Sequence, residues 1–158
     1  MSRHRQGGST FILKIAVTAT NVPTAEEHCQ RGLDLLAAGA PAEAAEAFRA
    51  AIAVESAQPG PAAPGPATPS PANIEAHHGL VRTLRDAGRL EQSIGAALAL
   101  TTLTPADPLA HTALSISLQA GGHVPEAEAA TARARVLEWK LQLQPPPEKS
   151  LSTQDLEP

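Results

Sequence analysis

A pattern of 34 residues occurs three times in this chain of 158 residues. The segments 25–58, 74–107 and 108–141 align with one another without a gap. Matching positions hold His28, His77 and His111, then Leu35, Leu84 and Leu118, then Gly39, Gly88 and Gly122. A unit this short cannot bury an apolar face by itself, so successive copies have to stack on one another. The chain is therefore expected to fold as one array of repeats.

The segment 59–73 separates the first copy from the second. Six of its fifteen residues are proline, and none is charged or large and apolar. Such a composition cannot bury enough apolar surface to offset the entropy of ordering, and it favours polyproline conformations. We interpret this segment as a mobile loop inserted into the array, which extends over 25–143. Residues 1–24 are assigned to an N-terminal leader whose role stays open, and 144–158 to a disordered tail.

Each copy has the signals of two helices joined by a tight turn. In the first copy, Thr24 and Glu27 are spaced as a capping box, Gly39 is placed to end the first helix, and Pro41 suits the first turn of the second. The apolar residues of the second helix recur at three- and four-residue spacing: Ala44, Ala47, Phe48, Ala51 and Ile52. This period is typical of a helix with one buried face. The chain has only two Phe, one Trp and no Tyr, which also favours closely packed helices over a sheet, so we predict an all-α fold.

The second and third copies repeat these signals. Asn73 is the expected cap of a helix that reaches about Asp86. Asp107 is the expected cap of the next helix, since proline follows it at the first helical position. The last helix is expected to reach about Leu143 before three consecutive prolines stop it, with Trp139 helping to cover the exposed end of the array.

The three copies resemble the tetratricopeptide repeat, a helix–turn–helix unit of 34 residues. The resemblance covers about 25–141 without the inserted loop, and these residues carry it: Gly32, Gly39, Ala44, Phe48 and Ala51, then Gly88 and Pro105, then Ser115, Gly122, Ala127 and Ala134. It implies a right-handed α-solenoid of antiparallel helix hairpins. The chain departs from the family where Ala97 and Thr131 replace the aromatic residue and where histidine replaces tryptophan. Fewer large side chains bury less apolar area, so we expect a marginally stable array.

In this family, protein or peptide partners bind in a concave groove lined by the first helix of each repeat. Position by position, the resemblance assigns the groove to these residues: Glu26, Cys29, Leu33, Leu36 and Ala37; Glu75, His78, Arg82, Arg85 and Asp86; Leu109, Thr112, Ile116, Gln119 and Ala120. A cationic centre, formed by Arg82 and Arg85 with His78, would then lie between two apolar ends. Such a groove suits a short peptide with apolar anchors around an acidic residue.

Two other interpretations stay open. In one, Arg82 and Arg85 are ordinary solvated side chains, and Leu33 and Ile116 belong to the core. In the other, the array has a structural role and associates with itself or within a larger assembly. Its groove would then be filled by residues 11–17 of the same chain or by a neighbouring copy.

The charge and the reactive residues favour neither nucleic-acid binding nor catalysis nor metal binding. The net charge is −4 with both signs interspersed, so nucleic acid and anionic membranes are not attracted in general. The sequence contains no phosphate loop, nucleophile elbow or paired metal motif, and we expect neither an enzyme nor a cofactor. His28, His77 and His111 would lie one helix apart, too far to converge on one zinc ion. We expect each to be half-buried in place of the family's tryptophan, with one ring nitrogen hydrogen-bonded, and a pH-sensitive stack is the alternative.

No run of about 18–20 apolar residues is present to span a bilayer. Near the N-terminus, Arg3 and Arg5 precede an apolar run, but Lys14 divides it and leaves a short apolar centre for a signal peptide. We therefore expect a cytoplasmic protein, and export with cleavage after Ala19 is the alternative.

Overall fold

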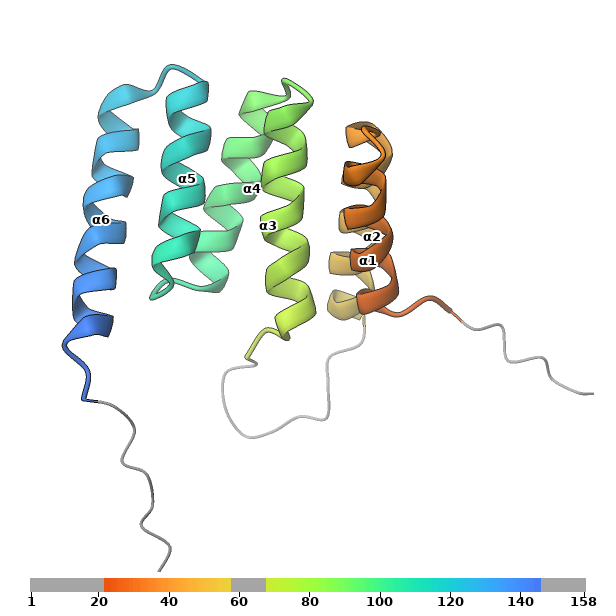
Figure 1. Ribbon diagram of the computed structural model, residues 1–158, viewed down its shortest axis with the longest axis horizontal. Helices are drawn as coiled ribbons and strands as arrows, with labels where there is room; N and C mark the ends of the chain where they lie inside the picture. The colour runs from red at the N-terminus through yellow and green to blue at the C-terminus, as the bar shows by residue number, and fades with distance from the viewer. Residues whose placement is uncertain (1–21, 58–67, 146–158) are drawn as a thin grey trace, which may run out of the picture.

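The computed structural model describes residues 22–57 and 68–145. These residues form six α-helices and no strand (Figure 1). The helices are α1 (Ala25–Ala37), α2 (Pro41–Ala57), α3 (Pro71–Asp86), α4 (Leu90–Leu103), α5 (Pro108–Ala120) and α6 (Val124–Gln142). The predicted all-α class is confirmed for this part of the chain. The expected leader up to residue 21, most of the inserted loop and the tail from residue 146 lie outside the described residues.

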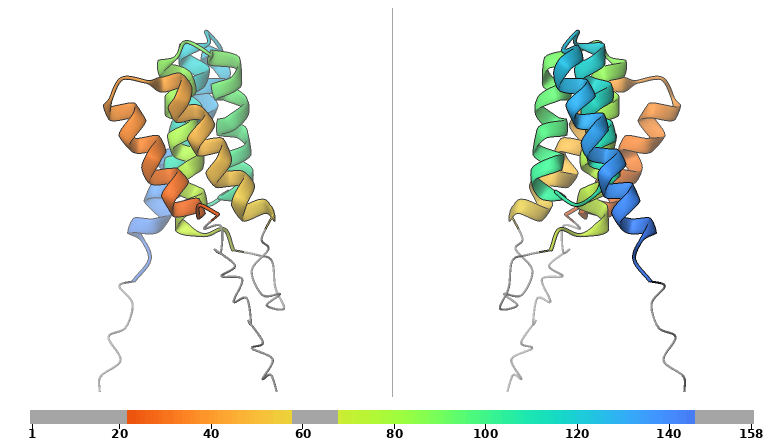
Figure 2. Two further views of the ribbon diagram at one scale, coloured as in Figure 1. Left: turned by 90° about the vertical axis from the view of Figure 1, so that its right-hand side faces the viewer. Right: turned by 90° about the vertical axis from the view of Figure 1, so that its left-hand side faces the viewer.

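Helices that follow one another in the sequence pack against one another, from α1 on α2 to α5 on α6. In addition, α1 packs against α3 and α3 against α5. The helices α2, α4 and α6 do not pack closely on one another, although the Arg49 guanidinium of α2 donates a hydrogen bond to the Gln92 Oε1 of α4 at 3.2 Å. As a result, α1, α3 and α5 form a continuous layer, and the helix pairs stand in a row (Figure 1). The right-hand view of Figure 2 looks onto α6, which is the last helix of this row.

Glycine ends the first helix of each pair in the same way. Gly39, Gly88 and Gly122 have φ angles of 76°, 72° and 83°, in the left-handed region that a side chain disfavours. The residue after each glycine donates its backbone N–H to the carbonyl five positions back, with N···O distances of 2.9, 2.8 and 2.9 Å. These bonds satisfy carbonyls that a helix end leaves without partners. The predicted turns are confirmed at all three positions.

Side-chain caps begin α1, α3 and α5. Thr24 and Glu27 form the predicted capping box, with the Glu27 backbone N 3.2 Å from the Thr24 Oγ1 and the Thr24 N 2.8 Å from the Glu27 Oε2. Asp107 caps α5 as predicted. The prediction of Asn73 as the cap of α3 is wrong. Ser70 is the cap, and its Oγ accepts a hydrogen bond from the Asn73 backbone N at 3.1 Å.

A contact with the end of α2 explains why α3 begins early. The backbone N–H of Ser70 donates to Glu55 Oε1 at 2.9 Å, and the Ser70 hydroxyl donates to the other carboxylate oxygen. Pro71 then occupies the first helical position, where its missing N–H costs no hydrogen bond. The last three residues of the predicted loop are therefore helical, and residues 15 positions apart are joined.

Phe48 is the largest fully buried side chain of the described core. It projects from α2 between two glycines, Gly32 on α1 and Gly79 on α3. A Cβ atom added at Gly32 would lie 2.7 Å from the phenyl ring, and one added at Gly79 would lie 2.5 Å from it. Both distances are shorter than any van der Waals contact, so only glycine lets the three helices approach the ring this closely.

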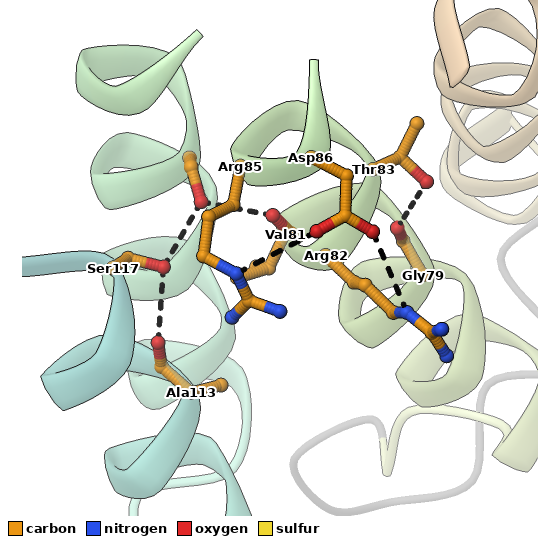
Figure 3. Close-up of polar contacts among 9 residues, drawn as sticks. Gly79, Val81, Arg82, Thr83, Arg85, Asp86, Ala113 and Ser117 are labelled. Carbon is orange, nitrogen blue, oxygen red and sulfur yellow. Dashed lines mark hydrogen bonds and ion pairs between the residues drawn. The ribbon is translucent and has the colours of Figure 1, made fainter. Parts of the chain in front are cut away.

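The corresponding interface between α3, α4 and α5 is built from small residues and buried hydroxyl groups. Ala97, which aligns with Phe48, is fully buried. The Ser93 hydroxyl donates to the Val81 carbonyl at 2.8 Å, and its oxygen lies 2.9 Å from the Ser117 Oγ (Figure 3). Ser117 also donates to the Ala113 carbonyl at 3.0 Å. Each buried hydroxyl is thus hydrogen-bonded, which the burial of a polar group requires.

Candidate functional site

The groove residues predicted from the sequence lie on helices that contact one another. We call the following set the first-helix face: Leu33 and Leu36 on α1, His78, Arg82, Arg85 and Asp86 on α3, and Ile116 and Gln119 on α5. Because α3 contacts both α1 and α5, the basic residues lie on the helix between the two apolar groups. Leu33 is 37% exposed and Ile116 is 44% exposed, so both reach the surface. Leu36 is half-buried and packs against the core.

The basic centre of this face is partly neutralised by aspartate. Asp86 lies 3.6 Å from the Arg82 Nε and 3.8 Å from the Arg85 Nε, and it separates the two arginines in Figure 3. The Arg82 side chain is 70% exposed and that of Arg85 only 26%. His78 lies 3.8 Å from a carboxylate oxygen of Asp107. Asp86 therefore offsets one of the two arginine charges, and Arg82 is the cation of this centre most open to solvent.

Cys29 does not belong to the accessible part of this face. Its side chain is 3% exposed and is part of the core cluster formed with Phe48. Burial raises the pKa of the thiol above its ordinary value, and the nearby Glu75 carboxylate raises it further. The thiol is therefore protonated at neutral pH and closed to solvent. The sequence alignment placed this residue in the groove, and the structure places it beneath the surface.

The three aligned histidines are half-buried, as expected for residues in the position of a packing aromatic. The Nε2 atom of His111 lies 3.1 Å from the Pro105 carbonyl oxygen, whereas the buried Nδ1 of His77 has no hydrogen-bond partner in the described residues. Among the described residues, the expected hydrogen bond to a ring nitrogen is therefore found at His111 but not at the buried Nδ1 of His77. Burial lowers the pKa of His77, and the neighbouring His78 lowers it further. Within residues 22–57 and 68–145, no group of three or more His, Cys, Asp or Glu side chains is arranged to hold a metal ion.

Surface depressions also lie in the first and last helix pairs. One of about 380 Å³ lies between α5 and α6 and includes Gln119, Thr131 and Arg135. Another of about 360 Å³ lies between α1 and α2 and includes His28 and Glu43. Sequence reasoning did not find them, because they arise where no further helix pair of the described chain covers the array. Thr131, for example, aligns with Phe48, which is fully buried.

A scan of protein-family models and a search of curated proteins give no match to this chain. None of the helices that the structure describes combines the length and the hydropathy needed to cross a membrane.

Proposed function

We propose that the chain is a tetratricopeptide-like array, a right-handed α-solenoid, which binds a protein or peptide on the first-helix face and catalyses no reaction. Three observations support the architecture. The sequence aligns with itself in three copies, each copy turns at a left-handed glycine, and the first helices pack closely on one another while the second helices do not. In a solenoid, stacking of this kind produces an extended surface suited to binding.

The exposed apolar residues on both sides of the basic helix carry the proposal. Leu33 on α1 and Ile116 on α5 reach solvent, although a residue that served only the core would be buried. Arg82 extends into solvent from α3 between them. An extended peptide that crosses the three helices would place apolar side chains on the outer two and an acidic residue at the centre. We therefore propose a ligand with apolar anchors on each side of an acidic residue.

Asp86 refines this ligand model. Its carboxylate already contacts both guanidinium groups, so an acidic ligand residue has to compete with it. Exposed ion pairs contribute about 0.2–1 kcal/mol, and their removal should therefore change affinity by up to about fivefold. The Asp86→Asn variant should bind an acidic peptide up to about five times more tightly than the original protein. Weaker binding by this variant would show that Asp86 holds the arginines in place for the ligand.

A displayed library of random peptides, selected on the full chain, tests the proposed function. Selected peptides should contain an acidic residue between apolar residues, and Arg82→Glu/Arg85→Glu should reduce their affinity at least tenfold. Arg31→Glu/Arg89→Glu makes the same change of charge away from this face and should leave affinity unchanged. Circular dichroism and thermal unfolding confirm that both variants are folded. Equal binding to both double variants would contradict the proposed site.

A further inference from the structure

The last helix has the fewest neighbours of the described helices. α6 is 19 residues long and is the longest of the six, yet it contacts only α5. The residues that face α5 are Ala127, Ala130, Ala134 and Leu137, and each is buried. Every other described helix contacts at least two others. Most of the circumference of α6 is therefore open to solvent in the described part of the chain.

The open side of α6 carries a second apolar row, which we call the outer stripe: Pro125, Ala129, Ala132, Val136, Trp139 and Leu143. Their spacings are four, three, four, three and four residues, the pattern of a helix that packs along another helix. All six are exposed, with Val136 at 43%, Trp139 at 61% and Leu143 at 64%. Trp139, which the sequence suggested as a cover for the end of the array, thus points into solvent.

The repeat pattern does not require this stripe. The aligned positions on α2 are Ala42, Glu46, Arg49, Ala53 and Ser56, and those on α4 are Glu91, Gly95, Leu98 and Thr102. Only Leu98 among these is a large exposed apolar residue. The bulky apolar side chains are therefore a particular property of the helix that has no neighbour on its outer side.

Both size and charge are graded along the stripe. Its N-terminal half has small residues, from Pro125 to Ala132, and is flanked by Glu126 and Glu128. Its C-terminal half has the bulky residues, from Val136 to Leu143, and the side chains beside it at three- and four-residue spacing are Arg133, Arg135 and Lys140. The two flanks thus differ in sign. A parallel pair of such helices would set bulky residues against bulky residues and like charges against like charges.

We infer that the outer stripe binds the outer stripe of a second copy of this chain, with the two α6 helices antiparallel. This orientation sets Val136 and Trp139 of one copy against the small residues of the other. It also sets each acidic flank against a basic flank, which favours the pair electrostatically. Both copies contribute the same residues to this contact, as a two-fold interface requires. The first-helix face is not used, so this inference does not depend on the proposed peptide binding.

The expected dimer is weak. A helix of 19 residues is about 28 Å long at 1.5 Å per residue. One such contact lies at the low end of protein interfaces, below roughly 1,200 Å² in total. We expect a dissociation constant of about 10–500 μM, in the range of weak and transient complexes. Tryptophan is the residue type that most often dominates such contacts, so Trp139 should contribute most.

Analytical ultracentrifugation of the full chain tests the inference. The mass should rise from 16.3 kDa towards twice that value as concentration increases. The Val136→Asp/Trp139→Asp variant should raise the dissociation constant at least tenfold. Leu98→Asp, which introduces one charge at an exposed apolar residue of α4, should leave it unchanged. A wild-type chain that remains monomeric up to about 1 mM, or a variant that associates equally well, would overturn the inference.

Exchange of the charged flanks tests the orientation. Arg133→Glu/Arg135→Glu makes both halves of the stripe acidic, and Glu126→Lys/Glu128→Lys makes both halves basic. Each variant alone should dimerise at least tenfold more weakly than the original chain, and an equimolar mixture should form a mixed dimer. Trp139, the only tryptophan, reports the contact through a blue shift of its fluorescence on association. A blue-shifted spectrum that is independent of concentration, with a monomeric mass, would show that the chain covers its own stripe and would refute the proposed dimer.

Discussion

Phe48 packs between two glycines, and this packing leads to a prediction about Gly79→Ala. The substitution should lower the free energy of unfolding when the Phe48 ring is present and raise it when the ring is absent. In the original chain, the Gly79→Ala methyl group would lie 2.5 Å from the ring. Overpacking of this kind costs about 1–3 kcal/mol, while alanine is favoured over glycine in a helix by about 0.5–1 kcal/mol. The net effect of Gly79→Ala should be a loss of roughly 0.5–2 kcal/mol in the free energy of unfolding.

The same substitution should stabilise a chain that lacks the ring. Phe48→Ala removes a fully buried phenyl group and should cost about 3–5 kcal/mol, a large part of the total stability of a domain of this size. In that background the three ring atoms nearest to the Gly79→Ala methyl group are gone, and the helical preference of alanine is what remains. Gly79→Ala should then increase stability by about 0.5–1 kcal/mol. The interaction energy between the two positions should therefore be about 1–3 kcal/mol.

Urea unfolding followed by circular dichroism measures all four members of this cycle. Gly95 provides the control, because it lies within α4 and a Cβ atom there would meet no atom within 4 Å. Gly95→Ala should stabilise the chain by about 0.5–1 kcal/mol whether or not the ring is present. If Gly79→Ala has the same effect in both backgrounds, contact with the ring is not the reason for glycine at this position.

Three further predictions concern the turns, the cap of α3 and the buried histidine. Gly88→Ala should destabilise the fold by about 1–2 kcal/mol in thermal unfolding, because φ is 72° there and alanine is strained in that region. Ser70→Ala should lower the free energy of unfolding by about 1 kcal/mol through loss of the cap, and by more if the bonds from Ser70 to Glu55 also contribute. The control Ser56→Ala, on the exposed end of α2, should change the free energy of unfolding little. An equal effect of both serine substitutions would argue against the cap. Burial lowers the pKa of His77 in the fold, so the folded chain favours the neutral imidazole. The contribution of this neutral histidine to the free energy of unfolding is fully present above pH 6.5, about the ordinary pKa of histidine, and is lost as pH falls through the folded pKa. Urea unfolding should therefore show a steeper loss of stability between pH 7 and pH 5 in the original chain than in His77→Gln, and equal slopes would exclude this role.

Local signals in the sequence were enough to predict most helix ends. The capping box, the three turn glycines and the Asp107 cap all act through bonds between residues at most five positions apart. The buried row around Phe48 is also local, because the period of the helix fixes which residues share a face. Even the left-handed turns follow from residue type alone, since glycine is the residue that adopts them without strain.

Contacts between distant residues decided the rest. Both Asn73 and Ser70 are good capping residues, and the bonds from Ser70 to Glu55 selected Ser70. Packing of α1 on α2 and α3 buried Cys29, although its repeat position suggested a groove.

The sequence thus determined the helices and their turns, because those depend on neighbouring residues. The tertiary structure determined which faces stay exposed, because exposure depends on which helices meet. It left Leu33 and Ile116 in solvent beside an arginine pair that Asp86 partly neutralises. It also left one helix, α6, with an apolar row on each side and a neighbouring helix on only one of them.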